Sequence, residues 1–289
     1  MSDFQAIVLG LVQGLTEFLP VSSSAHLIIV PWLFGWDEPG LSFDAALHLG
    51  TLAAVLVFFW REFWGMALAI PRALEKPKSL LFRREPLVDE KDRSARLLIL
   101  IAIATVPGLI AGVLAESAVD DLFHTEKHQS LAMAIIALML MGVGLIMLQA
   151  ERRATLSRGM DDLELADSAA IGLVQATAIV PGVSRSGATI TLGLFRGLKR
   201  EDAARFSFLL GTPLIAGAGA KGMLDTLQSG LSGHDATAFA LGMITSAISG
   251  FFAIGFLLRY LQRASIRAFV VYRIAMGALI LLLLATGLR

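Results

Sequence analysis

One segment of this chain occurs twice, and the two copies align without a gap at a constant offset of 162 residues. Residues 10–28 read GLVQGLTEFLPVSSSAHLI, and residues 172–190 read GLVQATAIVPGVSRSGATI. Both copies open with Gly-Leu-Val-Gln and share a Val-Ser-x-Ser motif. Each is an apolar run that is interrupted by proline and a serine cluster. In a membrane protein, interrupted segments at corresponding positions of two repeats are a strong sequence indication of a binding site.

The composition places this chain in a lipid bilayer. It is 56% hydrophobic and 17% charged, with a mean hydropathy of +0.72, whereas soluble domains are about 45–50% apolar and about 25% charged. No long stretch has a soluble composition, so we expect a single integral membrane domain over residues 1–289. The net charge of zero excludes a bulk electrostatic affinity for nucleic acid. The absence of cysteine excludes disulfides, thiolate metal sites and a cysteine nucleophile.

Six uninterrupted apolar runs are long enough to cross about 30 Å of hydrocarbon. They lie near residues 43–60, 97–115, 131–149, 203–224, 238–261 and 268–288. Two further apolar regions, 4–36 and 168–198, are broken near their centres by Pro20 and by Pro181-Gly182. Proline removes a backbone donor and glycine permits unusual dihedral angles, so each helix should break there.

We interpret each broken region as a re-entrant helical hairpin, because the segments after the breaks are short and begin with polar residues. A pair of full crossings stays open as an alternative. The expected fold is an all-α polytopic membrane protein of two inverted-topology repeats, each a re-entrant hairpin plus three transmembrane helices. Repeat one covers about 1–150 and repeat two about 168–289.

The basic residues are distributed as the positive-inside rule requires for this topology. Loops on one side carry 19 of the 24 lysines and arginines, and the other side holds only Lys127, Lys221 and Arg289. This asymmetry places both termini outside the cytoplasm. Three spans in each half make the second half inverted, so one hairpin enters from each face and the two tips can meet near the midplane.

In the first copy, Glu17 is the residue that most needs an explanation. A carboxylate at the centre of a span costs roughly 2.5–3.5 kcal/mol on insertion scales, which favours a functional role. Gln13 lies one helical turn before Glu17 and shares its face. We expect at least one serine of Ser22 to Ser24 to cap the next helix. Capping does not explain His26, which we expect beside Glu17, where a histidine can act as general base or nucleophile.

In the second copy, Arg185 is the strongest single indication of function. It opens a helix after a Pro-Gly break, among Ser184, Ser186, Gly187 and Thr189. Exposed amides, the positive end of a helix dipole, hydroxyls and a guanidinium together make an anion site, and phosphate is the obvious ligand. The alternative is an ion pair with Glu17 that only locks the two hairpins together.

Four other polar residues lie within the apolar segments. Asp44 and His48 are one turn apart near the outer end of a span, where we favour solvation over cation binding. Lys221 is expected to extend its amine to the outer interface. Arg273 is expected to pair with a hairpin carbonyl or with an acid.

These motifs closely resemble the two signatures of the BacA/UppP family, the bacterial integral-membrane undecaprenyl-diphosphate phosphatases. The first is QxxxEFLPVSSSAH at 13–26, and the second is PGVSRSGAT at 181–189. The resemblance also covers the FSFLL segment at 206–210 and the span pattern, so it extends over essentially the whole chain. The first family motif permits Glu or Gln at its first position. Here that position is Gln13, which weakens the case for a metal held by two carboxylates.

The resemblance implies an activity and roles for individual residues. The family removes the terminal phosphate of undecaprenyl diphosphate, at the outer side of the bacterial cytoplasmic (inner) membrane, with a divalent cation, usually Mg²⁺ or Ca²⁺. By position, Glu17 is the essential acid and metal ligand, His26 the base or nucleophile, Ser23 a nucleophile aided by His26, and Arg185 the diphosphate clamp. The substrate-binding set implied is Gln13, Ser22, Ser24, Ser184, Ser186, Gly187 and Thr189.

Three other interpretations compete with an undecaprenyl-diphosphate phosphatase. Inverted repeats with opposed hairpins also occur in transporters, so a transporter or flippase of a polyprenyl phosphate lipid is the main alternative. Lipid phosphatases with a histidine nucleophile fit less well, because no histidine follows Arg185 within 40 residues. A purely structural protein is disfavoured by the intramembrane Glu17, His26 and Arg185. The sequence does not determine the oligomeric state and leaves a homodimer open.

Overall fold

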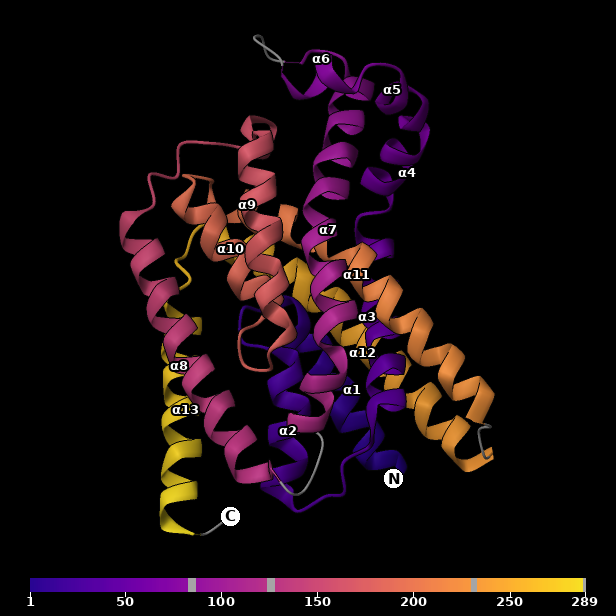
Figure 1. The fold of residues 1–289 in the computed structure, drawn as a ribbon, viewed down its shortest axis with the longest axis vertical. Helices are drawn as coiled ribbons and strands as arrows, with labels where there is room; N and C mark the ends of the chain where they lie inside the picture. The colour runs from indigo at the N-terminus through magenta and orange to yellow at the C-terminus, as the bar shows by residue number, and fades with distance from the viewer. Residues whose placement is uncertain (83–86, 124–127, 230–232, 288–289) are drawn as a thin grey trace.

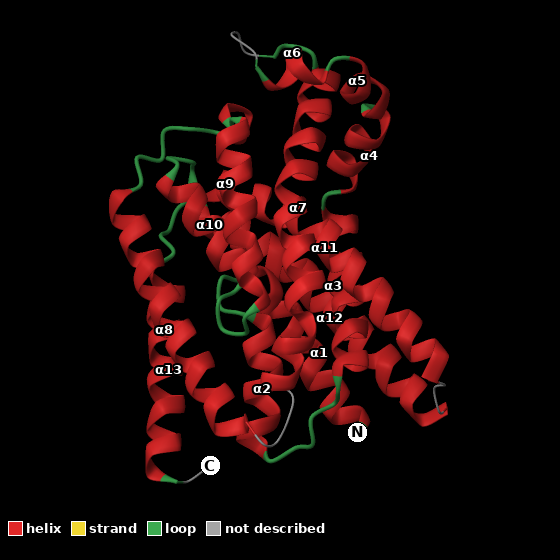
Figure 2. Ribbon diagram, viewed as in Figure 1, coloured by secondary structure: helices red, strands yellow, loops and turns green. Residues whose placement is uncertain are grey.

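The computed structural model describes residues 1–82, 87–123, 128–229 and 233–287, and helices make up nearly all of these segments (Figures 1 and 2). No strand occurs in the described segments; a single isolated β-bridge joins Arg158 to Leu198. The predicted all-α polytopic class is therefore confirmed.

Six described helices are long and apolar enough to cross a membrane, and they coincide with the six predicted spans. They are α3 (Leu41–Phe58), α7 (Glu90–Phe123), α8 (Gln129–Arg153), α11 (Arg200–Ser229), α12 (Gly233–Leu261) and α13 (Arg267–Thr286). Most extend past the predicted limits because polar end residues still favour helix. At the start of α7, for example, Glu90 and Asp92 lie in the first turn, where acidic side chains stabilise a helix.

Both predicted breaks are present. The first separates α1 (Asp3–Phe18) from α2 (Ser23–Phe34). The second separates α9 (Leu165–Ala176) and the short η3 (Thr177–Ile179) from α10 (Arg185–Phe195). The helices of each pair pack against each other. The two pairs come from opposite ends of the molecule, and their loops meet near its middle (Figure 2).

The ends of the molecule match the charge distribution of the loops. The short helices α4 (Trp60–Leu68), α5 (Ile70–Glu75) and α6 (Pro77–Leu81) lie at one end, and both chain termini mark the other (Figure 1). Arg72 on α5 pairs with Asp92 on α7 at 2.6 Å, which fixes this end to the bundle. Of the cations predicted for the opposite end, Lys127 and Arg289 lie outside the described residues. Which end faces the cytoplasm stays a prediction.

The repeated glycine of the Gly-Leu-Val-Gln motif has a packing role in both copies. A Cβ on Gly10 would lie 2.0 Å from the Thr245 hydroxyl of α12, and one on Gly172 would lie 2.4 Å from the Ala104 carbonyl of α7. In each interrupted helix pair, the glycine therefore lets the first helix approach the backbone of a membrane-spanning helix closely, as small residues do in membrane proteins. This packing holds the breaks in place.

Candidate functional site

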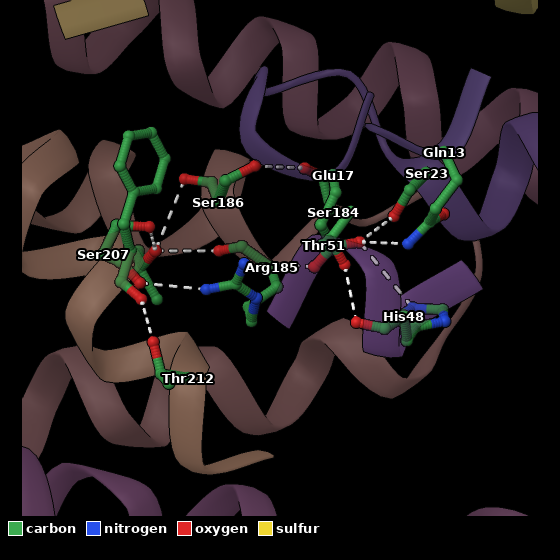
Figure 3. Close-up of polar contacts among 12 residues, drawn as sticks. Gln13, Glu17, Ser23, His48, Thr51, Ser184, Arg185, Ser186, Ser207 and Thr212 are labelled. Carbon is green, nitrogen blue, oxygen red and sulfur yellow. Dashed lines mark hydrogen bonds and ion pairs between the residues drawn. The ribbon is translucent and has the colours of Figure 1, made fainter. Parts of the chain in front are cut away.

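Glu17, at the end of α1, is the centre of a buried polar cluster (Figure 3). Its Oε2 accepts hydrogen bonds from Gln13 Nε2 at 3.1 Å and from Ser23 Oγ at 2.5 Å. Its Oε1 accepts from Arg185 Nη2 at 3.1 Å. Both repeats therefore contribute to the environment of a single carboxylate, as their meeting tips predicted.

Arg185 crosses from the second break to the first. Besides the ion pair with Glu17, its Nη1 donates to the Ser207 carbonyl at 2.9 Å, whereas its buried Nε has no partner among the described residues. Gly211 makes room for the guanidinium, since a Cβ there would lie 1.5 Å from Nη1. The predicted ion pair is present, and these two contacts use two of the five N–H groups of the guanidinium.

The hydroxyl groups of the second break are divided between the site and the scaffold. Ser184 Oγ accepts from the Gly187 amide at 3.0 Å and caps α10. Ser186 donates to the Leu19 carbonyl at 3.1 Å, which ties the breaks together. Thr189 donates to Ser207 Oγ at 2.7 Å. Of these three side chains, only that of Ser184 lines the adjoining cavity.

A cavity of about 470 Å³ opens beside this cluster. Its polar lining comes from Glu17, Ser23, Ser24, His48, Gln175, Ser184, Arg185 and Lys221, and much of its apolar lining from α7 and α11, including Leu109, Val113, Leu214 and Ile215. Lys221 is exposed at this lining. Five other predicted binding residues do not line the cavity in the described structure, so their direct contact with a ligand stays a prediction: Gln13, Ser22, Ser186, Gly187 and Thr189.

The structure does not bring His26 to Glu17 as the sequence predicted. Its ring is buried behind the first break, with Nδ1 2.6 Å from the Ser22 carbonyl and Nε2 2.6 Å from the Tyr272 hydroxyl. It is not part of the described cavity lining. The physical reason is the backbone of Ser22, whose φ of 77° turns the chain so that His26 stacks on Tyr272 of α13.

His48 on α3 is the histidine that lies at Glu17, although the sequence favoured a solvated residue near the outer end of a span. Its Nε2 is 3.7 Å from Glu17 Oε2, and it lines the cavity. Its Nδ1 lies 2.7 Å from the Asp44 carbonyl, which can only accept, so Nδ1 carries a proton. The Leu-Gly-Thr sequence that follows His48 recurs at 210–212, beside Arg185, and is the signal that could have identified it.

Arg273 is fully buried on α13 and confirms the predicted pairing with hairpin carbonyls. Its guanidinium donates to the Pro20 carbonyl of the first break at 3.2 Å, and to the Gly182 and Val183 carbonyls of the second at 2.6 and 3.1 Å. Two carbonyls of α8 complete its contacts. One side chain therefore satisfies broken backbone from both copies.

The donor set of the cluster fits a divalent cation that shares its coordination with a ligand. Among the described residues, no three or more His, Asp or Glu side chains are arranged so that they could hold one metal ion together. Glu17 nevertheless lies beside Gln13, whose buried Oε1 has no hydrogen-bond partner in the described structure. One carboxylate and one amide oxygen, completed by water and phosphate oxygens, are a typical Mg²⁺ environment.

Comparison with known proteins identifies the family of this chain. The model of the family described as "Bacitracin resistance protein BacA" matches residues 6–279. Relatives named "Undecaprenyl-diphosphatase" include those of Thermomicrobium roseum, 47% identical over 99% of both chains, and of Pelotomaculum thermopropionicum, 45% identical over 99% of this chain and 98% of the relative. Another, from Rubrobacter xylanophilus, is 47% identical over 97% of both. The chain belongs to the BacA family.

Proposed function

We propose that this protein hydrolyses undecaprenyl diphosphate to undecaprenyl phosphate and inorganic phosphate, and so recycles the lipid carrier for peptidoglycan synthesis. The observation that carries the proposal is the pairing of Glu17 with Ser23 and Arg185 in a cavity that also has an extensive apolar lining from α7 and α11. The polar cluster suits a charged diphosphate headgroup, and the apolar lining suits a polyprenyl chain. The names of the relatives support the same substrate.

The proposed binding mode uses the second break. The Arg185 guanidinium, which lines the cavity, and the amides that open α10 bind the diphosphate, since the first turn of a helix leaves amides without intrahelical partners. Ser24 and Ser184, which line the cavity, add hydroxyl donors. The ion pair with Glu17 keeps the guanidinium in place.

The proposed chemical step uses the first break. Ser23 Oγ attacks the terminal phosphorus and its proton passes to Glu17, to which it is already hydrogen-bonded at 2.5 Å. The bond between this phosphorus and the bridging oxygen breaks, and undecaprenyl phosphate leaves with the proton from Glu17, which restores the carboxylate. Water then attacks the phosphoserine while Glu17 takes its proton. The bond from phosphorus to Ser23 Oγ breaks, Oγ regains the proton from Glu17, and inorganic phosphate is released. A cation held by Glu17 and the Gln13 amide oxygen would offset the negative charge of the diphosphate when bound.

We place the site in the bacterial inner membrane, open to its outer side. The loops richest in lysine and arginine lie toward the end that carries α4 to α6, and the positive-inside rule assigns that end to the cytoplasm. The cavity lining reaches Lys221, which belongs to the half of α11 farther from its basic start. Substrate would thus enter from the outer leaflet.

Phosphate release from undecaprenyl diphosphate by the purified protein in detergent tests the function. We expect EDTA to abolish phosphate release and added Mg²⁺ or Ca²⁺ to restore it. We expect Arg185→Ala to lower the rate of release at least a hundredfold. Arg259→Ala, an exposed arginine at the basic end of α12, is the matched control and should keep full activity. Lipid binding without release under any cation would instead favour a carrier-lipid transporter.

A further inference from the structure

We propose, on the basis of the function above, that His26 is a positioning residue that acts through the Ser22 backbone, and that it takes no part in proton or phosphoryl transfer. Two features of the structure carry this inference. The histidine ring has no nitrogen available for the site, and Ser22 has a backbone conformation that needs an external support.

Both ring nitrogens of His26 are committed away from the cavity. The Ser22 carbonyl can only accept, so Nδ1 donates to it at 2.6 Å. Nε2 then accepts from the Tyr272 hydroxyl at 2.6 Å, and the two rings stack 5.6 Å apart at 13°. The residue is only 4% exposed. A nucleophile or general base has to present a nitrogen lone pair to the reacting group, and this ring has none left to present.

Ser22 is held in a costly conformation directly before the proposed nucleophile. Its φ of 77° and ψ of 93° lie in a region that L-residues with a Cβ rarely adopt. Such a residue persists only when its surroundings fix it, and such residues cluster at functional sites. Its carbonyl is fixed by His26, and its Oγ accepts from the Gly182 amide at 3.1 Å. The direction of Ser23 toward Glu17 depends on this arrangement.

The second copy shows why the support is needed only in the first. The equivalent serine, Ser184, has the same strained backbone, with φ 73° and ψ 115°. There the serine hydroxyl caps the Gly187 amide, which fixes the turn locally. Ser22, the N-cap residue of α2, makes no side-chain cap, so the capping expected from the sequence is wrong here; its hydroxyl accepts from the Gly182 amide instead. The position equivalent to His26 is Ala188, so an imidazole occurs only in the copy whose serine lacks a cap.

Two substitutions separate positioning from chemistry. Asn at position 26 keeps a side-chain N–H donor near the Nδ1 position but can be neither base nor phosphoryl acceptor at neutral pH. Ala keeps only the backbone amide of residue 26, which donates to the Ser22 carbonyl at 3.2 Å. For His26→Ala we expect kcat to fall about 10- to 100-fold, the range for one lost buried hydrogen bond. For His26→Asn we expect kcat within about tenfold of wild type, with KM and the shape of the pH profile unchanged. His128→Asn, which changes a histidine outside the site, is the matched control.

The outcomes are distinct. If folded His26→Asn is as inactive as His26→Ala while the wild type releases phosphate, or if His26→Ala keeps full activity, the positioning role is overturned. If the wild type itself releases no phosphate, the proposed function fails instead. Tyr272→Phe keeps His26 and removes only the hydroxyl that contacts Nε2, so it tests the same role if the variants at position 26 do not fold. A kcat lowered about three- to tenfold at unchanged KM supports the proposal, and full activity contradicts it.

Discussion

Replacing Arg273 with methionine should destabilise the fold strongly, although the residue is outside the cavity lining. Arg273 is 0% exposed and donates to five carbonyls. Two of them belong to α8, where helical hydrogen bonds remain after the substitution. The other three, on Pro20, Gly182 and Val183, lie in the breaks, where no helix replaces the lost donor. These three carbonyls decide the size of the effect.

The magnitude follows from two bounds. Polar contacts measured between membrane helices average about 0.6 kcal/mol, so three of them sum to about 2 kcal/mol. Hydrogen bonds to a charged donor are worth about 1.5–3 kcal/mol, which sets an upper limit near 9 kcal/mol. Removing a buried charge also recovers its desolvation cost, which opposes the loss. We therefore expect Arg273→Met to lower the free energy of unfolding by about 2 to 5 kcal/mol.

Unfolding of the purified protein by sodium dodecyl sulfate in mixed micelles measures this directly. Arg259→Met is the control, because it removes an exposed arginine from α12 and should change the free energy by less than about 0.5 kcal/mol. Arg273→Lys should fall between wild type and Arg273→Met, since it keeps the charge but fewer donors. An Arg273→Met protein as stable as Arg259→Met would refute the role assigned to these carbonyls.

Two further predictions concern packing. Gly211→Ala should reduce phosphate release at least a hundredfold, because its Cβ would lie 1.5 Å from Arg185 Nη1 and displace the guanidinium. Gly142→Ala is the control and should leave the release unchanged, because its Cβ would meet no atom within 4 Å. Equal activities of the two variants would contradict the close approach of Gly211 to Arg185. Asp167→Asn should lower the unfolding free energy by about 3 kcal/mol, because it leaves two arginines without a fully buried carboxylate. Asp161→Asn, at a largely exposed side chain, is its comparison, and an equal loss in both would argue against a special role for the buried acid.

The features that the sequence predicted correctly are those that follow from a continuous helix or from its interruption. Six long apolar runs gave six spans, and proline with glycine gave the two breaks. Gln13 and Glu17 are four residues apart on one helix, and their side chains do bond at 3.1 Å. The meeting of Glu17 with Arg185 followed from the opposed hairpins, because an uncompensated carboxylate and an uncompensated guanidinium would both be costly in lipid.

The sequence could not predict which histidine faces the carboxylate. Between Glu17 and His26 the helical period is broken, so the number of intervening residues says nothing about direction. The conformation of Ser22 decides it, and nothing in the serine-rich sequence reveals a φ of 77°. His48 comes from another helix, and its neighbourhood depends on how α3 packs against α1. Side-chain direction at a break is a tertiary property.

The duplicated geometry explains how one site obtains two different chemical groups. At the offset of 162 residues, Ser22 corresponds to Ser184, and Ser23 to Arg185. In both copies the serine has a positive φ, and in both the next side chain bonds to Glu17, Ser23 at Oε2 and Arg185 at Oε1.

The backbone thus presents the same position to the cavity from two sides, and divergence at that position provides a hydroxyl from one copy and a cation from the other. Glu17 corresponds to Ile179, which also lines the cavity, so the carboxylate exists only once. A second carboxylate at position 179 would compete for Arg185 and repel the diphosphate. The asymmetry of the side chains, set on a symmetric pair of breaks, is therefore what makes the site suited to an anion.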